Sequence, residues 1–376
     1  MIPFNKPHMT GNEVRYISEA HKNGKLAGDG PFTARCHEQI EFYSKTYKAL
    51  LTHSCTAALE MGCMLADLKP GDEVIMPSFT FVSTANAVVQ RGAIPVFVDI
   101  REDTLNIDER QIEGAITGKT RALLPMHYAG VACEMDTIIE IARKNGLVVI
   151  EDAAQGIMAR YRDLPLGSIG DLGTFSFHET KNIISGEGGC LLINRADLVN
   201  KAEIIREKGT DRNRFFRGEV DKYTWQSIGS SYLPGEMVAA FLSAQLEQAQ
   251  EITDQRLSSW EFYHKLLQPF EGQGLLRRPI VPDHCQHNGH IYYVLLSPDL
   301  DRDQVLTALR EQNISAVFHY VPLHSSPAGE HYGRVCGDLL KTDDLSARLI
   351  RLPLWYGISP AQQKQVVETL NTVLKM

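Results

Sequence analysis

Short apolar segments alternate with amphipathic ones between about residues 48 and 194, and this pattern most constrains how the chain folds. Alternation of this kind is typical of an α/β domain, in which helices cover a mostly parallel sheet. The amphipathic stretches are predicted helices because their apolar residues recur at helical spacing. We predict strands at KALLTHS, DEVIMPS, IPVFVDI, RALLPMH, LVVIED, GTFSFH and GGCLLIN, and helices at residues 55–68, 79–91 and 134–145.

The second half of the chain has a different pattern, which begins after a polar, charged stretch at residues 210–222. Residues 236–267 are predicted to form one or two long helices, and Pro269, Gly272 and Gly274 are expected to end them. The later predicted elements are the run IYYVLLS, a helix at about 301–312, the run SAVFHY and a last helix after Pro360. We therefore predict a large domain at residues 1–250 and a smaller α+β domain at residues 251–376.

The composition is that of an ordinary globular chain of 376 residues, 43% of them hydrophobic. A formal charge of -8 argues against a broad nucleic-acid surface, so any anion site is expected to be local. The sequence shows neither a secretory signal nor a run of roughly 20 apolar residues, and we expect a cytoplasmic protein without a membrane span. Seven scattered cysteines without a CxxC pair indicate no disulfide framework and no metal site.

Asp152 is the first candidate for chemistry, because it ends the apolar run LVVIED. Open α/β sheets bind ligands at the carboxyl ends of their strands. A carboxylate beside a pyridine nitrogen keeps that nitrogen protonated, and the ring can then accept electrons when a Cα–H bond breaks. Taken alone, an aspartate at a strand end is more often a cap or a salt-bridge partner, so this interpretation needs a second residue.

Lys181 is that second residue, and it follows the run GTFSFH in a polar turn closed by glycines, ETKNIISGEGG. Burial in a cleft would lower the pKa of its amine and supply the neutral form that makes an imine. A lone lysine is usually a solvated surface charge, and the argument rests on its pairing with Asp152 one strand earlier. Together the two residues predict that Lys181 carries pyridoxal 5′-phosphate as a Schiff base.

The start of the predicted helix at residues 55–68 is a candidate phosphate site. Ser54, Cys55 and Thr56 supply free amides and small hydroxyls at a predicted helix N-terminus, and Ser176 lies five residues before Lys181. Plain capping of the helix is the other interpretation of Ser54 and Thr56. Phe79, after another strand, is either a ring that stacks on a flat cofactor or a core aromatic.

Several ordered motifs are similar to those of a known family. SCTAAL, GDEVIMPSFTFVSTANAV, PVFVDI, VVIEDAAQ, SFHETKNIISGEGG and HYVPLH resemble the sugar aminotransferases of the DegT/DnrJ/EryC1/StrS family over essentially the whole chain. The resemblance implies a fold-type I pyridoxal phosphate enzyme with a mostly parallel mixed sheet in its large domain. It also implies a homodimer or a dimer of dimers, with active sites at the subunit interface.

The resemblance also implies roles for individual residues. Lys181 would hold the cofactor aldehyde, Asp152 the pyridinium nitrogen, and Gln155 the ring or its hydroxyl. Phosphate contacts would come from Cys55, Thr56 and Ser176, and Phe79 would stack on the ring. Many relatives carry a GYNxRM-like segment whose Asn reaches the partner's cofactor phosphate, whereas this chain has Ser231 at that place, in GSSYLP.

The expected reaction is amino transfer from L-glutamate to a keto sugar, with dTDP-4-keto-6-deoxy-D-glucose as the acceptor that the resemblance implies. Lys181 is the expected base, because it is held next to the reacting carbon. Further substrate candidates are three residues of FHYVPLH: His319, Tyr320 and His324. Donors to the sugar diphosphate are expected in a charged stretch that could equally be an exposed charge run: Arg212, Arg214, Arg217 and Lys222.

Different functions stay open at this point. The reaction could be a sugar 3-amination, and a pyridoxamine-dependent sugar dehydratase would share the fold but replace the lysine with histidine. A non-catalytic, regulatory pyridoxal-binding module is the candidate from another class, and the presence of both Asp152 and Lys181 argues against it. No strand is followed by GxGxxG, which argues against a nicotinamide dehydrogenase.

Overall fold

A large, mostly parallel sheet forms the centre of the computed structural model, which describes residues 1–375. Its strand order is β1-β9-β8-β5-β4-β2-β3-β13, and β9 alone runs antiparallel to its neighbours. The strands are β1 (Lys48–Thr52), β2 (Glu73–Pro77), β3 (Ile94–Val98), β4 (Thr120–Leu123), β5 (Val148–Asp152), β8 (Leu172–Ser176), β9 (Gly189–Ile193) and β13 (Arg334–Val335). All seven strands predicted for residues 48–194 are present.

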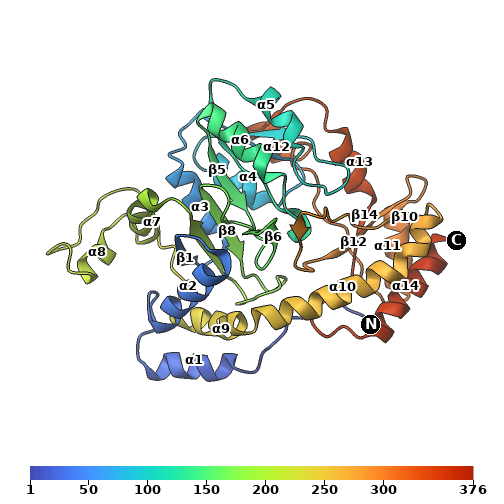
Figure 1. The fold of residues 1–376 in the computed structure, drawn as a ribbon, viewed down its shortest axis with the longest axis horizontal. Helices are drawn as coiled ribbons and strands as arrows, with labels where there is room; N and C mark the ends of the chain where they lie inside the picture. The colour runs from blue at the N-terminus through green and yellow to red at the C-terminus, as the bar shows by residue number, and fades with distance from the viewer. Residues whose placement is uncertain (376) are drawn as a thin grey trace.

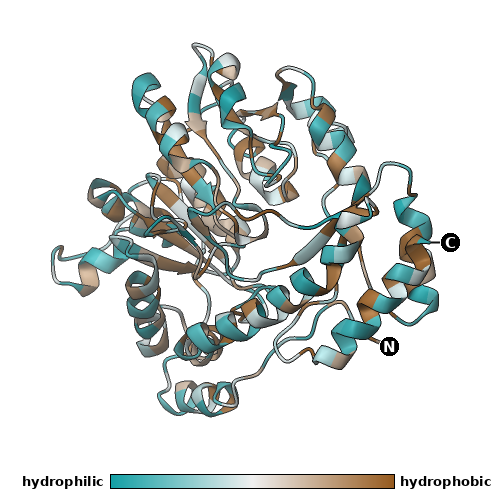
Figure 2. Cartoon of the chain, turned by 45° about the vertical axis from the view of Figure 1, so that its right-hand side comes forward, coloured by the Kyte–Doolittle hydropathy of each residue, from teal (hydrophilic) through white to brown (hydrophobic). Residues whose placement is uncertain are grey.

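Both faces of this sheet are buried, which explains why its strands are apolar almost throughout. Along β2, Val74 and Met76 join one hydrophobic cluster, while Ile75 between them joins the cluster on the other face. The first cluster includes residues of α3 (Cys55–Leu65), α4 (Val82–Val89) and α7 (Val199–Arg206). The second includes residues of α1 (Glu13–Lys22), α2 (Pro31–Ser44), α5 (Ile112–Ala115), α6 (Met135–Asn145) and α9 (Glu236–Glu247). Figure 2 shows the apolar strands between helices with hydrophilic outer faces.

The C-terminal part of the chain packs around a smaller antiparallel sheet, β10-β12-β14. The long helix α10 leads from the large sheet to this region, where α14 and α11 lie beside it (Figure 1). The sheet contains β10 (Leu276–Arg277), β12 (Tyr292–Leu296) and β14 (Leu349–Leu352), and the helices are α10 (Ala249–Gly272), α11 (Arg302–Glu311), α12 (Pro327–Tyr332), α13 (Leu340–Arg348) and α14 (Pro360–Leu374). A third, small sheet consists of β6 (Arg160–Tyr161), β7 (Leu164–Pro165) and β11 (Cys285–Gln286).

The predicted helix end is confirmed at Gly272, where α10 stops, and is wrong at Pro269, which α10 contains. Leu267 and Phe270 on either side are buried in the hydrophobic cluster of the smaller sheet. Their packing holds the last turn of the helix despite the backbone hydrogen bond that a proline removes. The predicted run SAVFHY forms no strand in the described residues, and only a bridge joins Val317 to Arg351.

The domain boundary at residue 250 stays a prediction, and two contacts cross it. Ile2 belongs to the hydrophobic cluster of the smaller sheet and pairs with Ile314. In the opposite direction, β13 adds to the edge of the large sheet beside β3. Within residues 1–375, no helix combines the length and the apolar character needed to cross a membrane.

Candidate active site

A cavity of about 720 Å³ opens at the carboxyl ends of β5 and β8. These strands are parallel neighbours, so Asp152 at the end of β5 and Ser176 at the end of β8 reach the same edge of the sheet. The turn after β8 brings Lys181 to the same place. The cavity has the size of a small-molecule site and lies where open α/β sheets bind ligands. The predicted site residues that line it are Ser54, Cys55, Thr56, Asp152, Gln155, Ser176, Lys181, His319 and Tyr320.

Asp152 is buried and held in one orientation by two hydrogen bonds. The Thr84 hydroxyl donates to Asp152 Oδ2 at 2.7 Å, and the backbone N–H of Ala154 donates to Oδ1 at 3.1 Å. Thr84 is fixed in turn by a hydrogen bond of 2.8 Å between its hydroxyl and that of Thr80. The carboxylate is therefore preorganised to stabilise a positive charge in the cavity.

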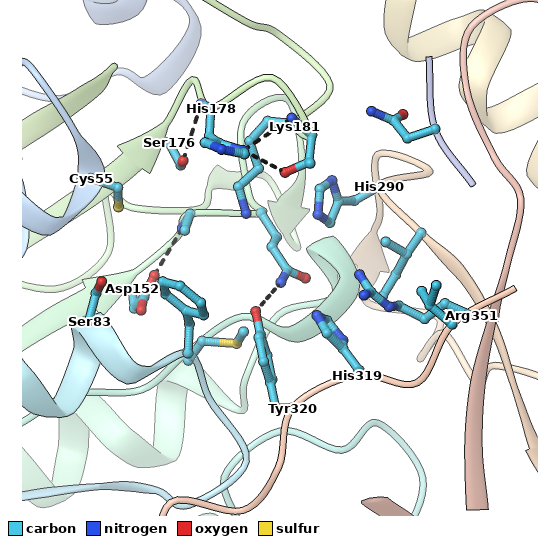
Figure 3. A pocket seen from close by; sticks show the side chains of 18 of the residues that line it. Cys55, Ser83, Asp152, Ser176, His178, Lys181, His290, His319, Tyr320 and Arg351 are labelled. Carbon is cyan, nitrogen blue, oxygen red and sulfur yellow. Dashed lines mark hydrogen bonds between the residues drawn. The ribbon is translucent and has the colours of Figure 1, made fainter. Parts of the chain in front are cut away.

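Lys181 points into the cavity from the turn after β8, as Figure 3 shows. Burial lowers the pKa of its amine from the ordinary value, and the positive charge of Arg351 acts in the same direction. Negative charge on Cys55 or Asp152 opposes the shift without reversing it. A lysine with a lowered pKa offers more neutral amine near neutral pH, which is the nucleophilic form.

The N-termini of α3 and α4 meet at one end of the cavity. Ser54 caps α3 by accepting a hydrogen bond of 3.1 Å from the backbone N–H of Ala57. A hydrogen bond of 2.7 Å joins the hydroxyls of Thr56, on α3, and Ser83, on α4. A Cβ on Gly189 would collide with the backbone of Ser54 and Cys55, so β9 approaches α3 closely because this residue is glycine. Free amides and two helix dipoles favour an anion here.

Tyr320 and His319 form another wall of the cavity, with their rings stacked at 3.8 Å between centroids. The Gln155 side chain bridges this wall to the sheet, because its amide nitrogen donates to the Tyr320 hydroxyl at 2.8 Å while its oxygen accepts from the backbone N–H of Ala129 at 2.7 Å. The His319 ring bonds to the Tyr128 hydroxyl through Nδ1, at 2.7 Å. Burial holds the pKa of His319 well below its usual range, so the imidazole is neutral near pH 7.

Comparison with known proteins decides the family. Residues 7–371 match the model of the DegT/DnrJ/EryC1/StrS aminotransferase family. The chain belongs to this family. The resemblance in the sequence motifs is thereby confirmed across nearly the whole length of the chain.

Individual relatives agree with this assignment. The GDP-perosamine synthase of Caulobacter vibrioides is 34% identical, over 98% of this chain and 97% of that protein. The aminotransferase TlmJ from Streptoalloteichus hindustanus is 26% identical with a TM-score of 0.91, and DesV of S. venezuelae is 27% identical with a TM-score of 0.89; each alignment covers 100% of this chain and 99% of the other. The chain is thus a sugar aminotransferase with the fold of the enzymes that depend on pyridoxal 5′-phosphate (PLP).

The cavity of this DegT/DnrJ/EryC1/StrS aminotransferase fits PLP at three points. Lys181 is an amine in the cavity lining whose pKa is lowered by burial, which favours bonding to an aldehyde. Asp152 is a fixed carboxylate for a ring nitrogen. The N-termini of α3 and α4 offer a site for a phosphate group. Figure 3 shows Cys55, Ser83, Asp152 and Ser176 on one side of the cavity, away from His290, His319 and Arg351.

The prediction that Phe79 stacks on the cofactor needs correction. Phe79 is only 1% exposed, does not line the cavity, and packs against Tyr128 and Tyr320 with ring centroids 5.1 and 5.5 Å away. Phe81 lines the cavity instead and is 54% exposed. The core interpretation therefore applies to Phe79, because its ring surface is already covered by aromatic neighbours.

His324 also lies outside the cavity lining and joins two structural elements. Its Nδ1 is 2.7 Å from the Ser78 hydroxyl, which follows β2, and its Nε2 is 3.4 Å from Asp343 of α13. Ser231 is exposed and forms a bridge with Glu207, away from this chain's own cavity. Its expected contact to a partner's cofactor stays a prediction.

The basic residues predicted to bind the diphosphate lie on a projecting segment, residues 210–228, which we name the α8 arm after α8 (Arg212–Phe216). Figure 1 shows it extending away from the body of the subunit. None of these residues lines this chain's cavity. The ion pairs of the arm are Arg212 with Glu207 at 3.6 Å, Arg214 with Glu219 at 3.1 Å, and Arg217 with Glu203 at 2.9 Å and with Glu219 at 2.6 Å; Lys222 is exposed.

Sequence reasoning missed several residues of the cavity, which come from segments distant in the chain. Arg351 lies on β14, and Arg256 lies on α10. His290 reaches the cavity from the loop before β12, and its Nδ1 is 3.0 Å from Asn182 Oδ1. Among the cavity residues that were missed, we could have found Ser83 from the sequence, because it lies near the start of the predicted helix at residues 79–91, which follows a strand.

Proposed function

We propose that this sugar aminotransferase transfers an amino group from L-glutamate to dTDP-4-keto-6-deoxy-D-glucose. The products would be dTDP-4-amino-4,6-dideoxy-D-galactose and 2-oxoglutarate. The sequence motifs resemble those of the dTDP-4-amino-4,6-dideoxygalactose transaminases of enterobacterial common antigen biosynthesis. That resemblance supports the choice of nucleotide and of the carbon that receives the amine.

The observation that carries the catalytic assignment is the convergence of a buried amine, a fixed carboxylate and two helix N-termini on one cavity. In this proposal Lys181 Nζ holds the cofactor, Asp152 pairs with its ring nitrogen, and Gln155 contacts the ring or its hydroxyl. Phosphate donors are drawn from the residues at the helix N-termini and the end of β8: Ser54, Cys55, Thr56, Ser83 and Ser176.

When bound, PLP supplies the aldehyde that captures an amino group and a ring that withdraws electrons from the substrate carbon. Lys181 Nζ then has the second task of moving the proton between the substrate carbon and the cofactor. Its lowered pKa suits this task, since a general base works best when its pKa lies near the working pH. His319 and Tyr320 are proposed to face the sugar, because both line the wall beyond Gln155.

We further propose that the enzyme works as a homodimer or a dimer of dimers, with active sites at the subunit interface. The α8 arm projects from the body of its own subunit, so its arginines would reach the cavity of a partner. In that arrangement Arg212 or Arg214 binds the sugar diphosphate, and Ser231 lies near the partner's cofactor phosphate. Arginine suits this role because its planar donors match phosphate oxygens.

A second acceptor, a GDP-linked 4-keto sugar, is favoured by one relative. The GDP-perosamine synthase of Caulobacter vibrioides shares 34% of its residues with this chain over nearly the full length of both. A sugar 3-aminotransferase and a regulatory PLP-binding protein are two further candidate functions. The 3-aminotransferase would form a different product, and the regulatory protein would form none.

The experiment is incubation of the PLP-loaded protein with L-glutamate and a panel of dTDP-, UDP- and GDP-linked 3-keto and 4-keto sugars. Mass spectrometry identifies the nucleotide that gains an amine, and NMR identifies the carbon and its configuration. The proposal expects the dTDP-linked 4-amino-galactose product to form fastest. Faster amination of the GDP-linked sugar or amination at the 3-carbon would replace it, and no amination at all would favour a regulatory PLP-binding protein.

A further inference from the structure

The cavity contains an arginine that no carboxylate neutralises. Arg351 lies on β14, and within residues 1–375 the only hydrogen bonds of its side chain are from Nε and Nη2 to the backbone carbonyl of Phe318, at 3.2 and 3.1 Å. The Phe4 ring lies 4.7 Å from the guanidinium carbon on one side. These contacts fix the group in place, yet the part of the chain that the structure describes provides no ion pair for it.

The surroundings of Arg351 add no negative charge. Burial lowers the pKa of Arg351, and the only opposing influence is negative charge on Tyr128 and Tyr320, with none from a carboxylate. Two acids line the cavity: Asp152, on the side of the helix N-termini in Figure 3, and Glu187, which is exposed beside His178. The guanidinium is half-buried and lines the cavity without an ion pair among the described residues, so its natural complement is an anionic ligand.

Nearby histidines do not change this balance. Burial and the charges of Lys181 and Arg351 hold the pKa values of His290 and His319 well below the usual range, so both rings are neutral near pH 7. Arg256, the other arginine of the lining, is buried and donates to the carbonyls of Gly289 and His290 at 3.1 and 2.6 Å. The wall around Arg351 is therefore positive and has no internal counter-ion among the described residues.

We propose that Arg351 binds the α-carboxylate of the amino donor. The inference rests on the proposed function, and it adds the residue that recognises the donor. An α-carboxylate is attached directly to the carbon that reacts at Lys181, so its receptor must lie beside that lysine. The influence of Arg351 on the pKa of Lys181 places the two charges within electrostatic reach, and Figure 3 shows both side chains around the same cavity.

The sugar diphosphate is a poorer match for this site. The diphosphate is separated from the 4-carbon by the sugar ring and continues into a nucleoside, which needs a route out of the cavity. Arg351 is instead held beside Phe4 and Phe318 and lines the same cavity as Lys181. A small carboxylate that enters with the amino acid fits this position, and the keto sugar has no equivalent group.

The test compares the Arg351→Gln, Arg351→Lys and Arg348→Gln variants of the PLP-loaded protein. Arg348 is the matched control, since it lies three residues earlier and pairs with Asp344 at 2.5 Å outside the cavity. Cofactor absorbance follows the single half-reaction with L-glutamate, with L-alanine, and with the amino sugar in reverse. Saturation curves separate the apparent dissociation constant of each amine from its limiting rate.

Loss of a charge-assisted hydrogen bond predicts about tenfold to hundredfold weaker binding of L-glutamate by Arg351→Gln. Binding of L-alanine should weaken by a similar factor, because it shares the α-carboxylate. Arg351→Lys should recover part of the lost affinity, and binding of the amino sugar should be unaffected. Unchanged amino-acid binding by Arg351→Gln, or an equal loss for the amino sugar, overturns the inference. A wild-type enzyme that reacts with L-alanine and not with glutamate refutes the proposed donor alone, and the comparison of Arg351 variants still holds.

Discussion

The arginines of the cavity and those of the α8 arm differ in what neutralises them. Arg351 is half-buried in the cavity lining, touches one backbone carbonyl and an aromatic ring, and has no carboxylate partner among residues 1–375. Each arginine of the arm has a side chain that is 41–42% exposed and pairs with a glutamate of its own chain. The charges of the arm already neutralise one another, whereas an unpaired charge in a cavity lining is free to bind an anion. Absence of a partner is therefore a stronger sign of a ligand than positive charge itself.

The same contrast holds for the lysines. Lys181 faces the cavity with a pKa lowered by burial, while Lys222 on the arm is exposed. The cavity thus contains a lysine whose pKa is changed by burial, whereas the lysine of the arm is exposed to water. Substitutions in the cavity and substitutions in the α8 arm should therefore impair activity in different ways.

The largest effect is expected from Lys181→Ala. This change removes the covalent attachment and the proton carrier together, so turnover should fall by at least about 10⁴-fold. Lys119→Ala, which alters an exposed lysine, is the control and should keep full activity. Thermal unfolding should show a folded protein, and residual turnover within tenfold of wild type would remove Lys181 from the mechanism.

Asp152→Asn should reduce turnover by about 10²–10³-fold, the cost of losing one preorganised electrostatic partner. The amide keeps the size of the side chain and can still accept from the Ala154 N–H, but it does not stabilise a protonated pyridine nitrogen. Cofactor retention is measured by absorbance after gel filtration. A variant that retains PLP and near wild-type rates would show that the carboxylate has another purpose.

A weaker and more selective effect is expected from charge reversal on the α8 arm. If a partner's cavity uses the arm, Arg212→Glu or Arg214→Glu should raise the KM for the keto sugar about tenfold to hundredfold. The half-reaction with L-glutamate should not change, in contrast to Arg351→Gln. Normal sugar binding by reversal variants at all four basic residues of the arm would make the arm a solvated segment, and the diphosphate site would have to lie elsewhere.

The smallest effect concerns the pH at which apoenzyme takes up PLP. Arg351 is the weaker of the two influences that lower the pKa of Lys181, so Arg351→Gln should raise that pKa only slightly. A higher pKa leaves less neutral amine at a given pH, and the curve of attachment rate against pH should move toward higher pH. A shift toward lower pH would contradict the electrostatic contact between the two residues.

Much of the large domain could be predicted because burial of both sheet faces leaves a clear apolar pattern. The seven strands between residues 48 and 194 follow from it, and so do Asp152 and Lys181 at the ends of adjacent strands. Ser54 had two possible roles in the sequence, and the structure shows that it caps α3. Phe79 and Phe81 stand two residues apart, and only packing distinguishes the core ring from the ring at the cavity.

The residues from the C-terminal region could not be predicted in the same way. Arg351 interrupts the apolar segment LIRL of β14, where a charged residue is usually taken to face water. Its position at the cavity depends on how the smaller sheet docks against the large one, which no local pattern encodes. No local pattern predicts the two-residue strand β13 either, because its pairing with β3 joins segments more than 200 residues apart.

The most direct test of the central claim is borohydride reduction of the yellow, PLP-loaded protein, followed by peptide mapping. Reduction turns the bond between an amine and the cofactor aldehyde into a stable link, and the modified residue can then be identified by mass. The account predicts a single pyridoxyl adduct on Lys181 and none in the Lys181→Ala variant. An adduct on a different lysine, or PLP that binds without any reducible bond, would contradict it.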